Sequence, residues 1–415
     1  MQGGDKPVPP DVPFSGHPAI IQMMKWTRTD FGPVPVKSWC EPLDAGTVEQ
    51  VRHLANHPKI FHHIALMPDC HIGCGMPIGG VIACEEAVIP NAVGVDIGCG
   101  MVAVQTDYAA DALKDTTVRR ILDDVKRTVP MGEGHAHRAP QQWAGFKKYG
   151  RPDWTDAHTW DLALRNLGTL GGGNHFLEIQ SGDDNLVWLM IHSGSRNFGL
   201  KVAEYHHRVA QKLNFETSSA DLAWLPVESK EGQAYIREMN FALDYARENR
   251  ARMMAAFCEQ VAHVLPGVEF TREINIHHNY AGRENHFGRE VWVHRKGATS
   301  ARAGETGIIP GSMGTPSYIV KGLGLADSFD SCSHGAGRRL GRRQACRTLT
   351  KEECDRAMRG VVFDGWKPAR GRKQKGLLDL EEAPPAYKDI EMVIKAQLDL
   401  IEPLVKLRPL GVLKG

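Results

Sequence analysis

Hard and soft metal ligands lie close together in the stretch Asn91–Met101, which reads Asn-Ala-Val-Gly-Val-Asp-Ile-Gly-Cys-Gly-Met. Asp96 carries a carboxylate, Cys99 carries a thiol three residues later, and three glycines surround them. Glycine takes positive φ easily and lets a backbone approach a ligand closely. A carboxylate and a thiolate on such a turn can hold a metal ion, and a thiolate sulfur can bridge two ions. The alternative is a strand end with a buried, inert cysteine.

Downstream histidines strengthen the metal interpretation, because each lies at the polar end of an apolar run, where functional sites collect. His175 follows a glycine cluster and Asn174, and His192 ends the apolar run that starts at Val187. His277 and His278 are adjacent near the end of another apolar stretch. Neighbouring residues of a strand point to opposite faces, so we expect one of these two to be a ligand.

Together these residues form a two-metal set of three imidazoles, one thiolate and one carboxylate. Two ions about 3.5–4 Å apart suit in-line chemistry at phosphorus, because they neutralise charge and orient the attacking and leaving oxygens. Ligand softness leaves zinc, iron, cobalt and manganese open, with zinc as the first guess.

A second group of residues is suited to a nucleotide. Ser312 and Ser317 lie in a loop with Gly311 and Gly314, the sequence Ser-His-Gly-Ala-Gly follows at 333–337, and Lys414 is near the end of the chain. Such hydroxyls, amides and a cation can surround phosphates and a base. The sequence has neither a Gly-x4-Gly-Lys-Ser/Thr phosphate loop nor a Lys-x-Asp-Gly motif. A covalent nucleotide would therefore need another nucleophile, for which His334 is the candidate; the alternative is a loop histidine that only forms hydrogen bonds.

Strands and helices must position these side chains. Residues 64–80 read as an apolar strand that enters a glycine-rich loop, with Asp69 and His71 as candidates to contact substrate or to support ligands. Cys70 and Cys74 have a loose Cys-x3-Cys spacing without a second pair, which disfavours structural zinc.

Helices are expected at four places. Thr47–Gln50 has the form of a capping box and opens a short helix that ends near His57. Residues 108–127, 201–213 and 231–265 also read as helices, the last with apolar residues at helical spacing. Residues 1–40 are expected to form an irregular arm, 131–160 a surface insertion and 298–321 a Gly/Ser/Thr loop. Because the glycine clusters lie at strand–loop junctions and not in linkers, we expect one domain over 1–415.

The composition indicates a globular protein without a dominant charge. The 415 residues are 42% hydrophobic and carry 50 basic and 49 acidic side chains, a net charge of +1. Nine cysteines, an odd number, favour reduced thiols and a cytoplasmic setting. We find no N-terminal apolar leader and no apolar run of membrane-spanning length, so no membrane is expected. Residues 338–375 carry 13 Lys and Arg against four Asp and Glu. This local charge of +9 could follow an RNA backbone, or form a merely solvated helix.

Several blocks in the same order resemble one family, the RNA-splicing ligases RtcB, over roughly residues 64 to 415. Residues 131–160 and 338–375 and the cysteines at 70 and 74 do not match its pattern. The blocks that carry the resemblance are Asn91–Met101, Gly168–Glu178, His192–Arg196, His277–Tyr280, Pro310–Ser317, Ser333–Arg338 and the final Gly-Val-Leu-Lys-Gly.

The resemblance implies an α/β mixed (α+β) fold, with central mixed β-sheets flanked by helices, and a residue-by-residue site. Cys99 would bridge two Mn²⁺ ions, Asp96 and His175 would hold one, and His192 and His278 would hold the other. His334 would take GMP from GTP as a phosphoramidate. Arg196 and Arg338 would bind RNA or nucleotide phosphates. Asn174 would contact the nucleotide phosphate, and the guanylate pocket would be lined by Glu178, Ser312, Ser317, Ala336, Gly337, Tyr387 and Lys414.

The implied reaction joins RNA with a 3′-phosphate or 2′,3′-cyclic phosphate to RNA with a 5′-hydroxyl, in RNA repair or tRNA splicing. One alternative is a dinuclear-metal RNA phosphodiesterase or phosphatase without a covalent nucleotide, for which His334 is optional. Another is a non-catalytic RNA-binding protein with a structural metal. The sequence leaves open the physiological RNA, GTP against ATP, the oligomeric state and any need for an activator protein.

Overall fold

Two large sheets dominate the computed structural model, which describes residues 23–369 and 376–415. The first, six-stranded sheet contains one parallel pair, β2 with β3, and is otherwise antiparallel. Its strands, in spatial order, are β1 (Trp26–Arg28), β2 (Val36–Ser38), β3 (Ile60–His71), β4 (Ile78–Cys84), β12 (Arg289–Lys296) and β11 (Asn279–His286).

The second, seven-stranded sheet is antiparallel throughout. Two short ribbons accompany the large sheets: β5 (Ala87–Val88) with β9 (Leu225–Pro226), and β13 (Ala298–Ser300) with β16 (Ser331–Ser333). The strands of the second sheet, in spatial order, are β10 (Phe270–His277), β6 (Gly100–Ala109), β8 (Leu186–Ser193), β7 (Phe176–Gly182), β17 (Ile401–Lys414), β15 (Ser317–Gly322) and β14 (Thr306–Ile309).

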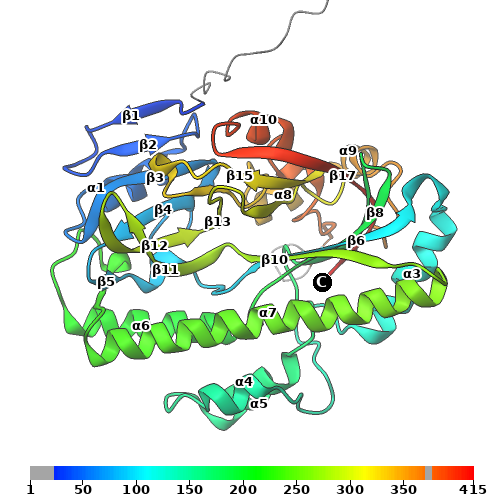
Figure 1. Cartoon of the computed structure of the whole chain (residues 1–415), viewed down its shortest axis with the longest axis horizontal. Coiled ribbons are helices and arrows are strands. Elements are labelled where there is room, and N and C mark those ends of the chain that lie inside the picture. The colour runs from blue at the N-terminus through cyan, green and yellow to red at the C-terminus, as the bar shows by residue number, and fades with distance from the viewer. Residues whose placement is uncertain (1–22, 370–375) are drawn as a thin grey trace, which may run out of the picture.

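Helices cover the outer faces of the sheets (Figure 1). The predicted mixed α/β fold, with central β-sheets flanked by helices, is confirmed, although only the first of the two large sheets is itself mixed. The α-helices are α1 (Ala45–Ala55), α2 (Pro90–Val93), α3 (Asp115–Thr128), α4 (Ala144–Tyr149), α5 (Ala157–Asn166), α6 (Phe198–Leu213), α7 (Lys230–Val264), α8 (Arg342–Thr348), α9 (Lys351–Ala357) and α10 (Ile390–Lys395).

Strand β8 shows why the second sheet is buried on both faces. Successive side chains of a strand point to opposite faces, and in β8 both sets are apolar. Leu189 and Ile191 belong to the core beneath α3 and α7, whereas Trp188 and Met190 belong to the core on the other face. The strand that carries His192 is therefore held rigidly from both sides.

Helix α7 runs along the sheets for 35 residues (Figure 1). At 1.5 Å per residue it is about 50 Å long. Ser229 caps its start by accepting a hydrogen bond from the Gly232 N–H, and Met253 and Phe257 pack under the second sheet. The helix predicted for residues 231–265 is confirmed, because its apolar stripe has the period of an amphipathic helix.

The predicted starts of two helices differ from the observed starts. Residues 108–114 were predicted as helix. In the structure 108 and 109 end β6, 110–112 form a 3₁₀ turn, and α3 begins only at Asp115. Thr47 was predicted to cap α1, but the cap is Asp44, whose side chain accepts hydrogen bonds from the Thr47 N–H and hydroxyl. Thr47 is buried inside the first turn of α1, and its hydroxyl donates to Asp44 and does not cap the helix.

The segment 298–321 is not a loop, as was predicted, but contains β13, β14 and β15. Ile308, Ile309 and Ile319 are fully buried, and pairing of β14 with β15 and of β15 with β17 extends the second sheet. Tertiary burial of these short apolar runs outweighs the high glycine and serine content around them. Only residues 310–316 connect β14 to β15 as a loop.

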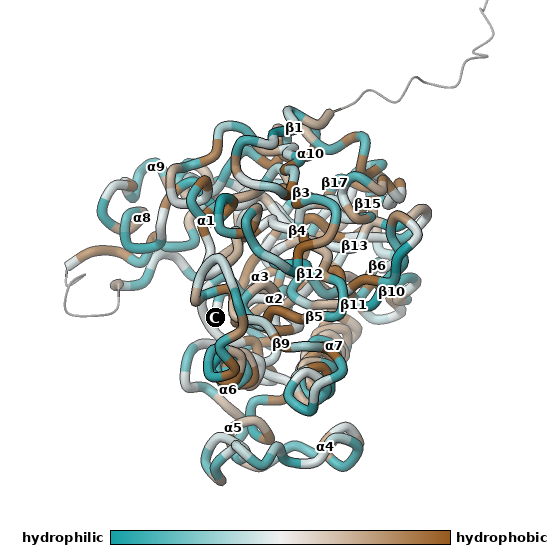
Figure 2. The backbone as a smooth tube through the Cα atoms, turned by 90° about the vertical axis from the view of Figure 1, so that its left-hand side faces the viewer, coloured by the Kyte–Doolittle hydropathy of each residue, from teal (hydrophilic) through white to brown (hydrophobic). Residues whose placement is uncertain are grey.

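Residues 131–160 lie along the outer side of α7, where α4 and α5 sit below α6 and α7 (Figure 2). Aromatic side chains pack this segment against α7: Phe146 lies near Tyr245, and Tyr149 stacks on Phe241 at 4.8 Å between ring centroids. Of the expected N-terminal arm, residues 1–22 are outside the described residues, while 23–40 contain β1 and β2. Among the described residues, no helix combines the length and the apolar character that crossing a bilayer requires.

Candidate functional site

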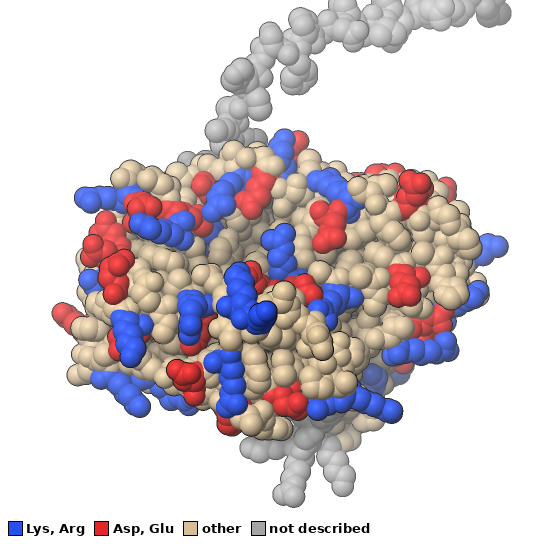
Figure 3. All heavy atoms as spheres, turned by 60° about the horizontal axis from the view of Figure 1, so that its bottom comes forward, with Lys and Arg blue, Asp and Glu red and all other residues tan. Residues whose placement is uncertain are grey.

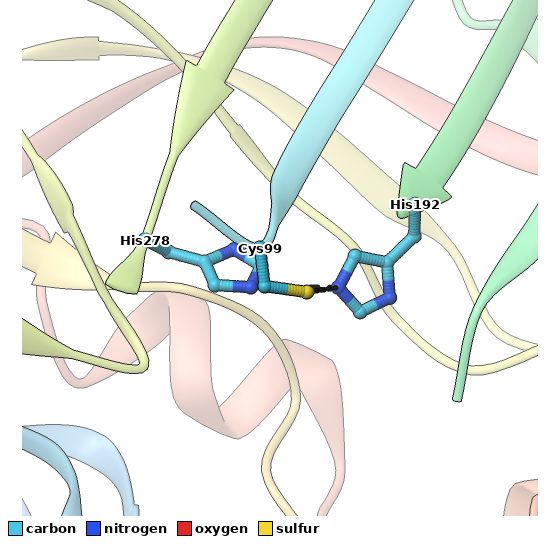
Figure 4. Close-up of side chains that lie close together, drawn as sticks. All are labelled: Cys99, His192 and His278. Atoms are coloured by element: carbon cyan, nitrogen blue, oxygen red, sulfur yellow. Dashed lines mark hydrogen bonds between the residues drawn. The ribbon is translucent and has the colours of Figure 1, made fainter. Parts of the chain in front are cut away.

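The ends of three neighbouring strands bring together a cysteine and two histidines (Figure 4). Cys99 directly precedes β6, His192 is the second-last residue of β8, and His278 links β10 to β11. Strand β6 lies between β10 and β8, and Gly100 pairs with both His277 and Ser193. The sheet register therefore determines that the three side chains converge.

Ligand atoms form two groups that share Cys99. In the first group the Cys99 Sγ lies 3.2 Å from the His192 Nε2, which lies 3.4 Å from the His278 Nε2. In the second the Cys99 Sγ lies 3.5 Å from the His175 Nε2, which lies 3.3 Å from an Asp96 carboxylate oxygen. A thiol shared by two ligand groups is the arrangement expected for a bridged pair of ions.

Hydrogen bonds orient the histidine rings toward the sulfur. The Nδ1 of His175 lies 3.0 Å from the carbonyl of Leu170, and the Nδ1 of His192 lies 3.1 Å from the carbonyl of Asn174. A carbonyl only accepts, so each Nδ1 carries a proton, and the Nε2 is the ring nitrogen that faces the sulfur and can bind an ion. The structure brings His278 to this cluster, and it places the His277 ring on the other side, against the Gly98 carbonyl at 3.0 Å.

The charges of the cluster also fit bound cations. Burial lowers the pKa of His192 and of His278 well below the ordinary value, so both rings are neutral. Burial, together with the neighbouring Asp96 carboxylate, raises the pKa of the Cys99 thiol well above its usual range. Burial opposes ionisation of Asp96, but His175 and Arg196 outweigh it and lower its pKa to about 2. Neutral imidazoles, a carboxylate and a thiol that needs a cation to ionise are together a metal-binding donor set.

Two adjacent polar residues of α7, Asn249 and Arg250, hold the loops that carry the ligands. Both are completely buried. One guanidinium nitrogen of Arg250 donates to the carbonyls of Gly98 and Ser193, each at 2.9 Å. The Asn249 amide oxygen accepts from the N–H groups of residues 168 and 169, and its amide nitrogen donates to the carbonyls of residues 169 and 194. Sequence reasoning missed this pair, although two polar residues inside the buried stripe of a helix are a signal.

His334 lies directly beside the cluster. It follows β16, and its ring centroid is 4.9 Å from that of His278. Its Nδ1 lies 2.6 Å from a carboxylate oxygen of Asp69, whose side chain is fully buried at the end of β3. Burial opposes ionisation of Asp69, but the charge and hydrogen bond of His334 outweigh it and lower the pKa of the carboxyl. The ionised carboxylate accepts the Nδ1–H, so that in the neutral form of the ring the lone pair is on the Nε2.

A cleft opens in front of His334. His192 and His278 reach it from the cluster, and Lys414 reaches it because β17 pairs with β7, which sets Lys414 opposite Phe176. Six of the eight residues predicted to bind the nucleotide line this cleft: Asn174, Ser312, Ala336, Gly337, Tyr387 and Lys414.

The other two predicted nucleotide residues, Glu178 and Ser317, lie outside the lining of the cleft. The Gln180 amide nitrogen donates to both, at 2.6 Å to Glu178 and 3.2 Å to Ser317. The Ser317 hydroxyl also accepts from the Gly311 N–H at 3.2 Å, so it supports the loop that borders the cleft. Burial raises the pKa of Glu178 to about 8.

Sequence reasoning missed Glu382, around which the cations of the cleft gather. Its carboxylate lies 3.1 Å from Arg338, 3.3 Å from Arg342 and 3.9 Å from Lys414, and it accepts a hydrogen bond from the Tyr387 hydroxyl. Burial opposes its ionisation, but these cations outweigh burial and lower its pKa. Its sequence neighbours, Ala383-Pro-Pro, do not indicate a role in binding, because only the folded structure brings this C-terminal segment to the cleft.

The predicted phosphate ligands lie on two sides of the cluster. Arg338 lines the cleft, and its guanidinium is over the Tyr387 ring at 5.0 Å. Arg196 lies on the other side, where its guanidinium is 3.5 Å from the His175 ring and 3.2 Å from the Thr169 hydroxyl. It packs so closely over Gly171 that a Cβ there would collide with it, which explains a glycine at that position.

Comparisons with known proteins identify the family of the chain. The model of the family described as tRNA-splicing ligase RtcB matches residues 50–415. The RNA-splicing ligase RtcB of Escherichia coli (strain K12) is 39% identical over 408 residues, which cover 92% of this chain and 97% of the relative. The tRNA-splicing ligase RtcB of Pyrobaculum aerophilum is 32% identical, with 89% and 91% covered. The RNA-splicing ligase RtcB of Mycobacterium bovis is 31% identical, with 88% and 100% covered. The family predicted from the sequence is thereby confirmed, and the chain belongs to the RtcB family.

Proposed function

We propose that the chain is an RNA ligase that joins an RNA 3′-phosphate or 2′,3′-cyclic phosphate end to a 5′-hydroxyl end, in RNA repair or tRNA splicing. It would use two Mn²⁺ ions and GTP. The observation that carries this proposal is His334: a buried carboxylate holds its Nδ1, its Nε2 forms no hydrogen bond with any described residue, and its ring centroid lies 4.9 Å from that of His278 in the two-metal ligand cluster. The names of the relatives support RNA ligation in general.

A 3′-phosphate needs activation before a hydroxyl can attack it, because it offers no good leaving group. In the proposed first step the Nε2 of His334 bonds to the α-phosphorus of GTP. The bond from that phosphorus to the bridging oxygen breaks, and pyrophosphate leaves with the electron pair. The proton stays on the Nδ1 of His334, where Asp69 accepts its hydrogen bond, and the Asp69 carboxylate stabilises the positive charge that develops on the ring. Lys414, Ser312 and Asn174 line the cleft, and in this proposal they hold the nucleotide.

The later steps transfer the nucleotide and then release it. A cyclic end is first opened by water to a 3′-phosphate. An oxygen of the 3′-phosphate attacks the guanylate phosphorus, and the phosphorus–nitrogen bond breaks to return the electron pair to Nε2. The 5′-hydroxyl oxygen then attacks the RNA 3′-phosphorus, loses its proton, and displaces GMP. Arg196 and Arg338 flank the cluster and can hold the phosphates during these transfers.

The metal ligands in this proposal are the five residues of the cluster. Asp96, Cys99 and His175 form one group, and Cys99, His192 and His278 the other, with the thiolate between them. When bound, the ions would neutralise charge on the phosphate oxygens and align the reacting groups. Asp96, with a pKa of about 2, is ionised at neutral pH and ready to bind.

A guanylylation assay tests the proposal. The purified chain is incubated with Mn²⁺ and GTP, or with ATP in parallel, and its intact mass is measured before and after acid treatment. We expect an acid-labile GMP adduct on the wild type and none on His334→Ala. A wild type without an adduct that still opens cyclic phosphates would instead be a dinuclear-metal phosphodiesterase. A wild type without either activity would be an RNA-binding protein with a structural metal.

A further inference from the structure

Five arginines lie between residues 338 and 347, where the sequence has no aspartate or glutamate. They begin in the loop after His334 and continue through α8. By contrast, Lys and Arg are interspersed with Asp and Glu over the face that Figure 3 shows. A short segment of one sign in a chain of net charge +1 is a local electrostatic feature.

Helix α8 directs part of this charge outward. Its Ala345 and Cys346 are buried under the helix, whereas Arg343 and Arg347, one helical turn apart, are exposed. Arg339 lies four residues before Arg343, in the segment that leads into α8, and is also exposed, with its Nε donating to the Pro385 carbonyl. Within the part of the chain that the structure describes, none of these three forms an ion pair with a carboxylate. We name Arg339, Arg343 and Arg347 the arginine ridge.

Arg342 connects the arginine ridge to the reaction centre. It lines the cleft, it lies 3.3 Å from Glu382, and its guanidinium is 3.4 Å from where a Cβ on Gly173 would be. Gly173 directly precedes Asn174 and His175. The exposed charges of the ridge are thus the outward continuation of the cleft wall.

We propose that the arginine ridge binds the phosphate backbone of the RNA strand that carries the 3′-phosphate; this rests on the proposed function. All members are arginines, whose planar guanidinium groups bind phosphates through two hydrogen bonds and stack on bases. The activated 3′-phosphate must reach the nucleotide on His334, and the ridge follows in sequence on Arg338 and Arg342, which line the cleft beside His334. The helix is about 10 Å long, enough to follow roughly two or three phosphates.

Binding of short single-stranded RNAs to the full chain tests the ridge. One fluorescent RNA ends in a 3′-phosphate, and the other carries a 5′-hydroxyl and a blocked 3′ end. For R343A/R347A we expect a Kd for the 3′-phosphate strand about tenfold higher than that of the wild type. The slope of log K against log salt should fall by about 1.4, or 0.7 for each lost contact. The Kd for the other strand and the GMP adduct should stay unchanged. R343K/R347K should recover the salt dependence but only part of the affinity, because lysine restores the charge without the planar guanidinium.

The matched control is R208A/R237A, which removes two exposed arginines from α6 and α7. Equal weakening by this control would mean that only net charge matters, and would overturn the proposal. Unchanged binding of the 3′-phosphate strand to R343A/R347A, or a loss confined to the 5′-hydroxyl strand, would overturn it as well. If the wild type forms no GMP adduct but the ridge variant still loses the 3′-phosphate strand, the RNA site stands and the ligase assignment fails.

Discussion

Two buried carboxylates near the cleft have opposite protonation states because of their neighbours. The pKa of Asp69 is lowered, since His334 outweighs burial, whereas the pKa of Glu178 is raised to about 8 by burial. Asp69 therefore serves as a fixed negative charge behind a histidine. Glu178 carries a proton at neutral pH in the absence of a ligand.

Asp69→Asn should retain the hydrogen bond to the His334 Nδ1 but remove the negative charge. The ring would then become positive without a counter-charge during nucleotide transfer, so we expect guanylylation to slow by about 10²-fold or more. Single-turnover formation of the GMP adduct measures this rate. Asp327→Asn, which removes a carboxylate paired with Lys37, serves as the control. A normal rate for Asp69→Asn would show that orientation alone is needed.

Glu178 should make the stability of the unliganded protein depend on pH. Its folded pKa of about 8 exceeds the unfolded value, even though Lys414 opposes the shift. The stabilisation is therefore complete below the unfolded pKa of about 4.3 and is lost as pH rises through 8. Between pH 5 and pH 8 we expect Glu178→Gln to gain stability relative to the wild type. Urea unfolding without metal or nucleotide, across this range, measures the gain; parallel curves for the two proteins would contradict the raised pKa.

At the scale of elements, α7 determines whether the ligand loops are formed correctly. Asn249→Ala leaves the N–H groups of residues 168 and 169 buried without an acceptor, which should cost about 3 kcal/mol of unfolding free energy. Because His175 follows that loop, metal affinity should fall as well. Asn240→Ala, at an exposed position of the same helix, should change stability by less than about 0.5 kcal/mol. Urea unfolding and the metal content of dialysed protein give both quantities.

How much of these elements the sequence reveals depends on the range of the interaction that forms them. The 35 residues of α7 have a period that any long amphipathic helix shows, so its bounds could be predicted within one residue. Strands β14 and β15 could not, since β15 becomes a strand through pairing with β17, about 80 to 90 residues later, and β14 through pairing with β15. The same holds for Glu382, which reaches Arg338 and Lys414 only after the tail folds back.

At the scale of the whole molecule, the site lies where the two sheets meet. His278 joins β10 of the second sheet to β11 of the first, and Cys99 precedes β6. Residue types and the resemblance indicated which side chains belong together, but the register of β6 between β8 and β10 determines their distances. The segment 131–160, which falls within the residues matched by the family model, packs along α7, far in sequence from its aromatic partners, which explains why its place could not be predicted.

Because the ligand cluster ties several elements together, bound metal should stabilise the entire fold. Ligands that bind only the native state raise stability by mass action. We expect chelation to lower the Tm, and added Mn²⁺ to restore it with two ions bound per chain. Cys99→Ser should keep the shape of the site but remove the shared thiolate, and should reduce the content below two ions. Cys332→Ser, at another buried cysteine outside the cluster, should keep two. Elemental analysis of the dialysed proteins, together with thermal unfolding, would contradict this expectation if Cys99→Ser retained both ions at wild-type affinity.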